Sequence, residues 1–453
     1  MTEWSQIVGS HPELYVKGSG MNNRRTFLKA AALSATSAVV SARGRAEQAV
    51  KPRPALTPNS IPVGTLPQHF DVEPGIHNLE NGYWGIMPRA VAQIYAEQTM
   101  YVNRNNSIWA RNVLPGGACL AAGGREAREA VAKMVGCATE EIAITRSGSD
   151  ALQALITNYK DIHPGDAVIY CDLDYDAMIA AMDWLGDHRG AQVAKFAMPE
   201  PATTENILAA YDAVLKRTPN AKLLLVTQVS NRTGLVTPVK KIVAMARGRG
   251  VDTVVDIAHG VACLDFQIDD LGCDFAGWSV HKWTSAPLGT GAMYIRKSRL
   301  DAIDVAYDNH DIPATDITAR VPAGTVNFAA LLTIPTAVKF HFAVGGAAKE
   351  KHLRDLRNRW VDQVRGVRNV EICVPDDPKR YCAITSFRLK GMQTDEQAQR
   401  LQHVLFEKYR VHTVWRHGIA KGPVIRVTPG LYSTMADSDA LAKALQLENS
   451  MFV

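Results

Sequence analysis

The 453-residue sequence lacks several features that would point to particular classes of protein. Its seven cysteines include no C-x-x-C pair and no spacing typical of a zinc site, so we expect buried free thiols and no metal centre. No internal repeat and no apolar run long enough to span a bilayer as a helix is present. Apolar residues make up 47% and charged residues 21%, which is ordinary for a globular protein.

The main part of the chain also lacks a surplus of charge. The formal charge is +5, but residues 1–46 carry six lysines and arginines against two acids. The remaining residues carry 44 basic and 43 acidic side chains, which nearly balance. We therefore predict no nucleic-acid partner, because such proteins need a basic surface.

The N-terminal region predicts export. Met21 begins MNNRRTFLKAAALSATSAVVSARGRA, in which Arg24 and Arg25 precede a weakly apolar run, Ala30–Val40, followed by small residues up to Ala46. This pattern is typical of a twin-arginine signal peptide. We expect translation to start at Met21 and the leader to be removed, so that the twin-arginine export machinery delivers a periplasmic protein with no membrane segment. The alternative is a cytosolic N-terminus with a chance arginine pair.

The rest of the chain divides by composition. A proline-rich arm is expected at residues 47–75, a large domain at 76–330 and a small α+β domain at 331–453. The large domain alternates short apolar segments with helical patterns, which predicts an α/β fold with a seven-stranded, mostly parallel sheet covered on both faces. The predicted strands are Glu141–Thr145, Ala167–Cys171, Gln192–Ala197, Lys222–Val229, Thr253–Ile257, Phe275–Ser279 and Ala292–Ile295. The predicted helices include Ala122–Val135, Ser149–Tyr159, Asp176–Trp184, Thr204–Arg217 and Lys240–Arg247.

One stretch, Val254–Arg296, carries the strongest chemical signal. An apolar run ends in Asp256, with His259 three residues later, and a second apolar run ends just before Lys282. A lysine held near a buried site suits a Schiff base, and an acid on a neighbouring strand can keep a pyridine nitrogen protonated. Taken singly, the two residues would more often be a surface lysine and a helix cap.

The ordered set resembles a known family. Asp256, His259 and the segment SVHKW, followed by AP-x-G-x-G and a short strand, are similar to the class V aminotransferases of fold type I, and most similar to the branch named after isopenicillin N epimerase. This resemblance implies a fold-type-I transferase that binds pyridoxal 5'-phosphate. It also implies a homodimer that acts on a small amino acid or amine.

The resemblance assigns most of the cofactor site to the same stretch. Lys282 forms the Schiff base and then transfers protons, and Asp256 pairs with the pyridine nitrogen. His259 lies beside the ring, while Ser279 and His281 contact the phosphate.

Further cofactor contacts are implied elsewhere in the chain. Gly148 and Ser149 align with the phosphate-binding turn, where a helix N-terminus favours an anion. Tyr175 aligns with the ring that stacks on the cofactor, and Asn231, in S-N-x-T-G-x-x-x-P, with the asparagine that contacts the phenolic oxygen. Thr325, in AGTVN, aligns with the threonine that reaches the phosphate of the neighbouring subunit, although a helix cap is an equal alternative.

Three residues are predicted to bind substrate. Arg426 aligns with the arginine that holds the α-carboxylate, and Asn81 lies in a predicted turn at the mouth of the site. Arg104 lies in an amide-rich stretch that we interpret as a loop, either binding or merely solvated.

The reaction stays open at this point. No cysteine occurs shortly upstream of Arg426, which disfavours persulfide chemistry. Tyr175 over one face of the ring disfavours an epimerase, which needs a second base. A transaminase or a C–S lyase is favoured, an oxidative decarboxylase stays open, and a maturation or sensor protein that binds the cofactor without turnover is the rival.

Overall fold

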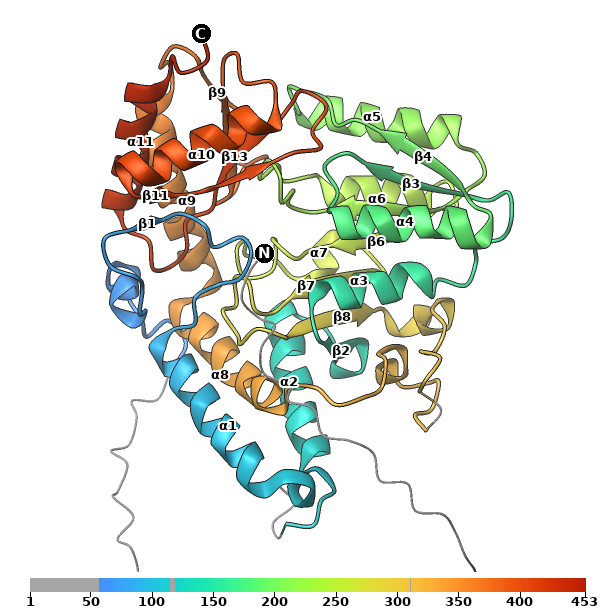
Figure 1. The fold of residues 1–453 in the computed structure, drawn as a ribbon. Coiled ribbons are helices and arrows are strands. Elements are labelled where there is room, and N and C mark those ends of the chain that lie inside the picture. The colour runs from blue at the N-terminus through green and yellow to red at the C-terminus, as the bar shows by residue number, and fades with distance from the viewer. Residues whose placement is uncertain (1–56, 115–118, 310) are drawn as a thin grey trace, which may run out of the picture. The chain divides into compact units, whose positions relative to one another are not determined.

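The computed structural model describes residues 57–114, 119–309 and 311–453 (Figure 1). The predicted leader, its twin-arginine motif and the start at Met21 lie outside the described residues, as does the first part of the proline-rich arm. Within the described ranges no single helix is long and apolar enough to cross a membrane. The pair α8 (Phe328–Val344) and α9 (Gly346–Val364) meets that criterion only jointly, across a bend of 76°.

The predicted seven-stranded sheet is present, in the order β2-β8-β7-β6-β5-β3-β4. Only β8 runs antiparallel to its neighbours, so the prediction of a mostly parallel sheet is confirmed. The observed strands lie within two residues of the predicted ones at each end: β2 (Ile142–Thr145), β3 (Ala167–Cys171), β4 (Gln192–Phe196), β5 (Ala221–Thr227), β6 (Asp252–Asp256), β7 (Phe275–Ser279) and β8 (Gly291–Ile295).

Two hydrophobic clusters cover the two faces of this sheet. Along β5, Leu223 and Leu225 belong to one cluster and Leu224 and Val226 to the other, because successive side chains of a strand point to opposite faces. The Leu223 face is packed by α3 and α4, and the Leu224 face by α2, α5 and α6. These helices span α2 (Leu120–Val135), α3 (Gly148–Thr157), α4 (Asp176–Arg189), α5 (Thr204–Arg217) and α6 (Val239–Arg247).

The C-terminal part forms a separate antiparallel sheet in the order β12-β13-β10-β9, and Figure 1 shows its elements in orange to red. Its own cluster of buried apolar residues lies between the sheet and α9, α10 and α11. A small parallel pair, β1 with β11, adjoins it. These elements span β1 (His77–Asn78), β9 (Val370–Ile372), β10 (Thr385–Leu389), α10 (Asp395–Tyr409), β11 (Val411–His412), β12 (Val414–Arg416), β13 (Val424–Val427) and α11 (Met435–Glu448). The predicted domain boundary at residue 330 stays a prediction.

Short helical turns connect these elements: η1 (Val63–His69), η2 (Thr139–Glu141), α7 (Ile268–Leu271), η3 (Lys297–Ala302) and η4 (Ile317–Arg320). The first of them belongs to the described end of the predicted arm. Ile61, Leu66 and Phe70 of that segment are buried in the main core. This part of the arm therefore packs against the body of the protein.

The loop predicted around Arg104 is wrong. Residues Arg89–Ala110 form the long helix α1, interrupted by Asn106 at a φ of 46°. Only Val91 and Trp109 of this helix are buried, and Arg104 is exposed. The dense amides and charges therefore occupy the solvent-exposed side of a helix, which favours polar residues as strongly as a loop does.

Candidate functional site

The parallel strands place their carboxyl ends at one edge of the large sheet, and a pocket lies there. In open α/β sheets this edge is where ligands bind. The pocket collects eight residues that the sequence predicted together: Gly148, Ser149, Tyr175, Asn231, Asp256, His259, Ser279 and Lys282. The other four lining residues were not predicted from the sequence as site residues; they are Leu152, Thr227, Val229 and Ala258.

Asp256 is the last residue of β6 and is 5% exposed. The backbone N–H of Ala258 donates a hydrogen bond of 2.8 Å to its Oδ1. Burial raises the pKa of the Asp256 carboxyl, because desolvation disfavours its charged form. A cation brought against this carboxyl would reverse that shift, and a protonated pyridine nitrogen is such a cation.

Lys282 and His259 form the centre of the pocket. Lys282 Nζ lies 3.0 Å from His259 Nε2, and Trp283 Nε1 donates a 3.3 Å hydrogen bond to His259 Nδ1. Since the indole can only donate, the neutral His259 carries its proton on Nε2 and presents it to the lysine. That arrangement suits an uncharged amine on Lys282 that accepts the hydrogen bond.

The electrostatics of the pocket shift Lys282 toward its neutral form. Burial lowers the pKa of Lys282 to about 8, against the opposing effect of Asp256. Burial also lowers the pKa of His259 well below its usual range, and the charge of Lys282 adds to this. With a pKa of about 8, roughly a tenth of the Lys282 amine is neutral at pH 7, far more than for an ordinary lysine, and the neutral amine is the form that attacks an aldehyde.

The N-terminus of α3 forms one wall of the pocket. The side chain of Ser147 caps the helix by accepting a 3.1 Å hydrogen bond from Asp150 N. The backbone N–H of Gly148 donates a hydrogen bond of 3.1 Å to Ser279 Oγ. A Cβ on Gly148 would lie 2.7 Å from Ser279 N, so only glycine allows this close packing of helix and strand. The positive end of the helix dipole and a hydroxyl therefore meet where a phosphate is expected.

Two polar side chains complete the pocket. Asn231 is buried, and its Oδ1 has no hydrogen-bond partner within the described residues, which fits a ligand group at that position. Tyr175 directly precedes α4, lines the pocket and is 38% exposed. With Asp256, Lys282 and the α3 N-terminus, these residues fit pyridoxal phosphate. Their individual roles stay predictions.

Two predicted phosphate contacts do not line the pocket. His281 donates from Nδ1 to the carbonyl of Thr290 at 2.8 Å, and burial lowers its pKa to about 4. Its Nε2 is then an acceptor, so a bond to phosphate requires protonation. Thr325 is exposed in the loop before α8, and Asn327 rather than Thr325 caps that helix by accepting from Ala330 N. Within one chain, Thr325 is not part of this site.

Arg426 lies on β13, is 1% exposed, and is already paired. It forms an ion pair with Glu80 and donates a 2.9 Å hydrogen bond to the carbonyl of Asn231. A Cβ on Gly82 would lie 2.5 Å from Arg426 Nη2, so the predicted turn packs directly on the guanidinium. Asn81 of the same turn is buried and donates from its backbone to Thr428 at 2.9 Å.

Sequence reasoning missed several residues around the pocket. Glu80 directly precedes Asn81 in the predicted turn. This neighbourhood is the only feature of the sequence that could have identified Glu80. Asp174 is fully buried and accepts a hydrogen bond of 2.6 Å from Thr227 Oγ1. Burial raises the pKa of its carboxyl to about 7. Through the hydrogen bond, Asp174 orients the strand that ends beside Asp256. Arg416, the last residue of β12, is a third residue that the sequence did not single out.

Arg104 is not near these residues. It borders a shallow surface hollow with Ala96, Glu97, Met100 and Tyr101, all from α1. The structure of one chain therefore gives no support to its predicted contact with substrate.

The chain is similar to known proteins in sequence and in fold. The sequence profile of the family described as Aminotransferase class-V matches residues 88–437. The isopenicillin N epimerase of Streptomyces clavuligerus is 26% identical over 401 residues, covering 83% of this chain and 95% of that protein. The fold is similar to that of the cysteine desulfurase CsdA from Escherichia coli, with a TM-score of 0.72 at 20% identity over 87% of this chain and all of that one. It is also similar to a C-DES variant with glycine covalently linked to its PLP cofactor, with a TM-score of 0.70 at 19% identity over 84% and 98% of the two chains.

Proposed function

From the premise that the chain belongs to the class-V aminotransferase family and is a pyridoxal-phosphate-dependent enzyme, we propose that it removes the α-proton of an amino acid in a transamination or a C–S lyase reaction. The observation that carries this proposal is the contact of 3.0 Å between Lys282 Nζ and His259 Nε2, beside the buried Asp256. An amine with a lowered pKa is a base suited to neutral pH.

The protein's own groups divide the work. When bound, pyridoxal phosphate supplies an electron sink that stabilises negative charge at the carbon next to the substrate nitrogen. Asp256 keeps the pyridine nitrogen protonated, and the N-terminus of α3 with Ser279 binds the phosphate. Lys282 takes the proton from the α-carbon and returns it, while His259 orients the amine through its Nε2–H.

Proton transfer from one side favours these two reactions over epimerisation. Apart from Lys282 and His259, the lining residues contribute no amine or imidazole. An epimerase needs a second base on the opposite face, where the ring of Tyr175 is expected. No cysteine lines the pocket, which disfavours the persulfide chemistry that needs a nucleophilic thiol.

A panel of amino acids in heavy water tests the proposal. We expect deuterium at the α-carbon of at least one amino acid with retained configuration. A keto acid would identify a transaminase, and ammonia with a sulfur product would identify a lyase. Inverted configuration would instead establish the epimerase. Cofactor-loaded protein that exchanges no α-proton would overturn the proposal in favour of binding without turnover.

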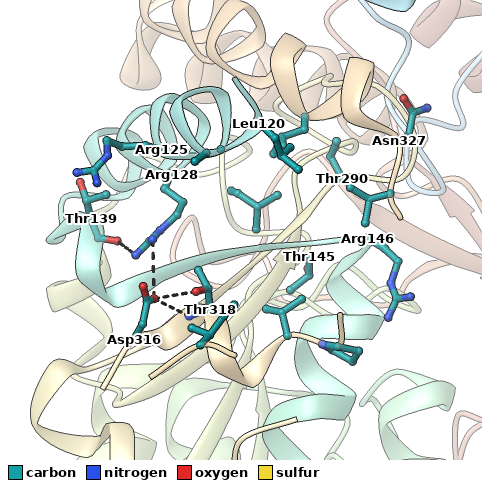
Figure 2. A pocket seen from close by; sticks show the side chains of 18 of the residues that line it. Leu120, Arg125, Arg128, Thr139, Thr145, Arg146, Thr290, Asp316, Thr318 and Asn327 are labelled. Atoms are coloured by element: carbon teal, nitrogen blue, oxygen red, sulfur yellow. Dashed lines mark hydrogen bonds and ion pairs between the residues drawn. The ribbon is translucent and has the colours of Figure 1, made fainter. Parts of the chain in front are cut away.

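We also propose a homodimer, supported by a large cavity next to the site. Its volume is about 950 Å³, and Figure 2 shows Leu120, Arg125 and Arg128 of α2 on one side and Asp316 and Thr318 on the other. The lining includes Thr145, which ends β2 just before the α3 turn, and Thr290, whose carbonyl holds His281. It also includes Val326, the neighbour of Thr325. A second copy that fills this cavity would bring its own loops to the phosphate end of the site.

A shared site links assembly to cofactor binding. We expect removal of the cofactor to weaken the dimer and dilution to weaken cofactor binding, because each event stabilises the other. Sedimentation of loaded and unloaded protein over a concentration series measures both. Thr325→Val should weaken cofactor binding and Thr325→Ser should restore it. A loaded protein that stays monomeric and active at micromolar concentration would contradict the shared site.

Export is the third part of the proposal, and it rests on the sequence of the leader. Replacement of Arg24 and Arg25 by lysine should leave the protein in the cytoplasm. N-terminal sequencing of the wild type from the periplasm should begin near Glu47 or Arg43. Export that is unchanged in the lysine variant would show that another route is used.

A further inference from the structure

Three arginines lie beside the pocket, and two of them are paired with carboxylates. Arg426 forms its ion pair with Glu80, and Arg232 forms one with Asp176. Arg416, the last residue of β12, forms no hydrogen bond or ion pair through its guanidinium within the described residues, and its Nε is buried without a partner. Among the three, Arg416 is therefore the arginine without a carboxylate partner within the described residues.

Arg416 is half-buried, and the fully buried arginines differ from it in having partners. Every buried arginine of the described chain has at least one hydrogen bond or ion pair; these residues are Arg232, Arg320, Arg357, Arg380, Arg388 and Arg426. A donor left without a partner costs free energy, because it has lost water and gained nothing. An anionic ligand would supply the missing acceptor.

The register of the C-terminal sheet directs Arg416 toward the site. Val414 pairs with Arg426, and Arg416 pairs with Val424. Arg416 and Arg426 are thus diagonal neighbours on one face of the sheet, about 7–8 Å apart at the backbone. That face meets the large sheet, since Arg426 donates to the carbonyl of Asn231.

The electrostatics of the site agree with this register. Burial and the charge of Arg426 lower the pKa of Arg416 to about 10, and Glu80 and Tyr175 partly oppose them. The charge of Arg416 in turn contributes to the lowered pKa of Lys282. The charge of Arg416 is therefore felt at the Lys282 amine, and Arg426, Glu80 and Tyr175 in turn act on Arg416.

We propose that Arg416 binds the carboxylate of the substrate, while Arg426 keeps Glu80 as its partner. The guanidinium offers Nε and one Nη as parallel donors, the geometry that a carboxylate accepts. Glu80 is chemically equivalent to a substrate carboxylate and already fills the place on Arg426. This inference rests on the proposed function and narrows it: the substrate is an amino acid with a free carboxylate, and a simple amine is excluded.

Two reagents that attack the bound cofactor isolate this contact. Aminooxyacetate carries a carboxylate, whereas O-methylhydroxylamine has the same reactive group without one. Both change the visible absorption of a loaded enzyme, so their rates are measured without turnover. In Arg416→Gln we expect the rate constant for aminooxyacetate at low concentration to fall about 10- to 100-fold, and that for O-methylhydroxylamine to stay within about twofold.

Two further variants separate specific binding from net charge. Arg400→Gln removes one positive charge from an exposed position on α10 and should leave both rates unchanged. Arg416→Lys keeps the charge but loses the paired donors, so it should lose part of the rate for aminooxyacetate alone. It also serves as the decisive variant if Arg416→Gln fails to load the cofactor.

The outcomes distinguish a failure of the proposed function from a failure of the carboxylate assignment. A wild type that shows no cofactor absorption overturns the proposed function itself. A loaded wild type whose Arg416 variants react with both reagents at wild-type rates overturns only the assignment of the carboxylate to Arg416. An equal loss with both reagents means that Arg416 shapes the site without binding the carboxylate, and it also overturns the assignment.

Discussion

At the carboxyl edge of the large sheet, Asp256 and Lys282 face the pocket, and neither forms an ion pair within the described residues. The carboxyl of Asp256 receives one backbone hydrogen bond, and Lys282 contacts the neutral His259. On the face of the C-terminal sheet, Arg426 is equally buried but carries its own partner, Glu80, and a backbone carbonyl. Both regions border the same site, but buried charged groups lack ion pairs in the first region and form one in the second.

The difference shows which end of the site depends on a ligand. At the sheet edge, burial raises the pKa of Asp256 and lowers that of Lys282. The predicted cofactor offers a cation for Asp256 and an aldehyde for Lys282. The paired arginine needs no ligand and contributes to the stability of the chain. Substitutions at the first end should therefore change chemistry, and substitutions at the second should change folding.

The largest effect is expected from Lys282→Ala. Without the amine no covalent bond to the cofactor forms and no base remains for the α-proton, so activity should be lost completely. Absorption spectra and trapping with borohydride measure the bond, and Lys241→Ala, an exposed lysine of α6, is the control. A variant that keeps the visible band and is still trapped would contradict the assignment.

Asp256→Asn should retain the cofactor but lower turnover by about 100-fold or more, since a neutral amide cannot hold the pyridine nitrogen protonated. The measurement is kcat beside the amount of bound cofactor. Turnover within about threefold of the wild type would show that the reaction does not need this electron sink.

Glu80→Gln tests the paired end. The amide keeps an acceptor for Arg426 but removes the countercharge, so the free energy of unfolding should fall by about 1–3 kcal/mol. Denaturant unfolding measures it, with Glu371→Gln as control, because Glu371 pairs with Arg388 at the surface and is 57% exposed. An equal loss of unfolding free energy in the two variants would mean that the buried pair stabilises the protein no more than the exposed one.

The smallest effect concerns pH. Because the pKa of Lys282 is lowered to about 8, the fraction of neutral amine rises with pH up to that value and then levels off. The rate at which protein without cofactor captures pyridoxal phosphate should follow the same curve. An unperturbed lysine would continue to gain rate up to about pH 10.4. A rate that still rises steeply at pH 9 would show that burial does not displace this group.

The sequence by itself determined the sheet and the centre of the pocket. Short apolar runs predicted all seven strands, and the residues that end them, such as Asp256 and Ser279, meet because parallel strands share one edge. Local pattern was enough there, since each residue's place follows from its own strand. It was misleading around Arg104, where the exposed side of a helix has the composition of a loop.

Only the tertiary structure decided how the charges are shared. Glu80 and Arg426 are 346 residues apart in the chain, and no spacing in the sequence announces their ion pair. Arg416 carries no motif, and it stands out only because the fold pairs Arg232 and Arg426 with acids and leaves Arg416 without one among the described residues. Periodicity shows which residues are buried, but the partner of a buried charge depends on distances in space that the order of residues does not contain.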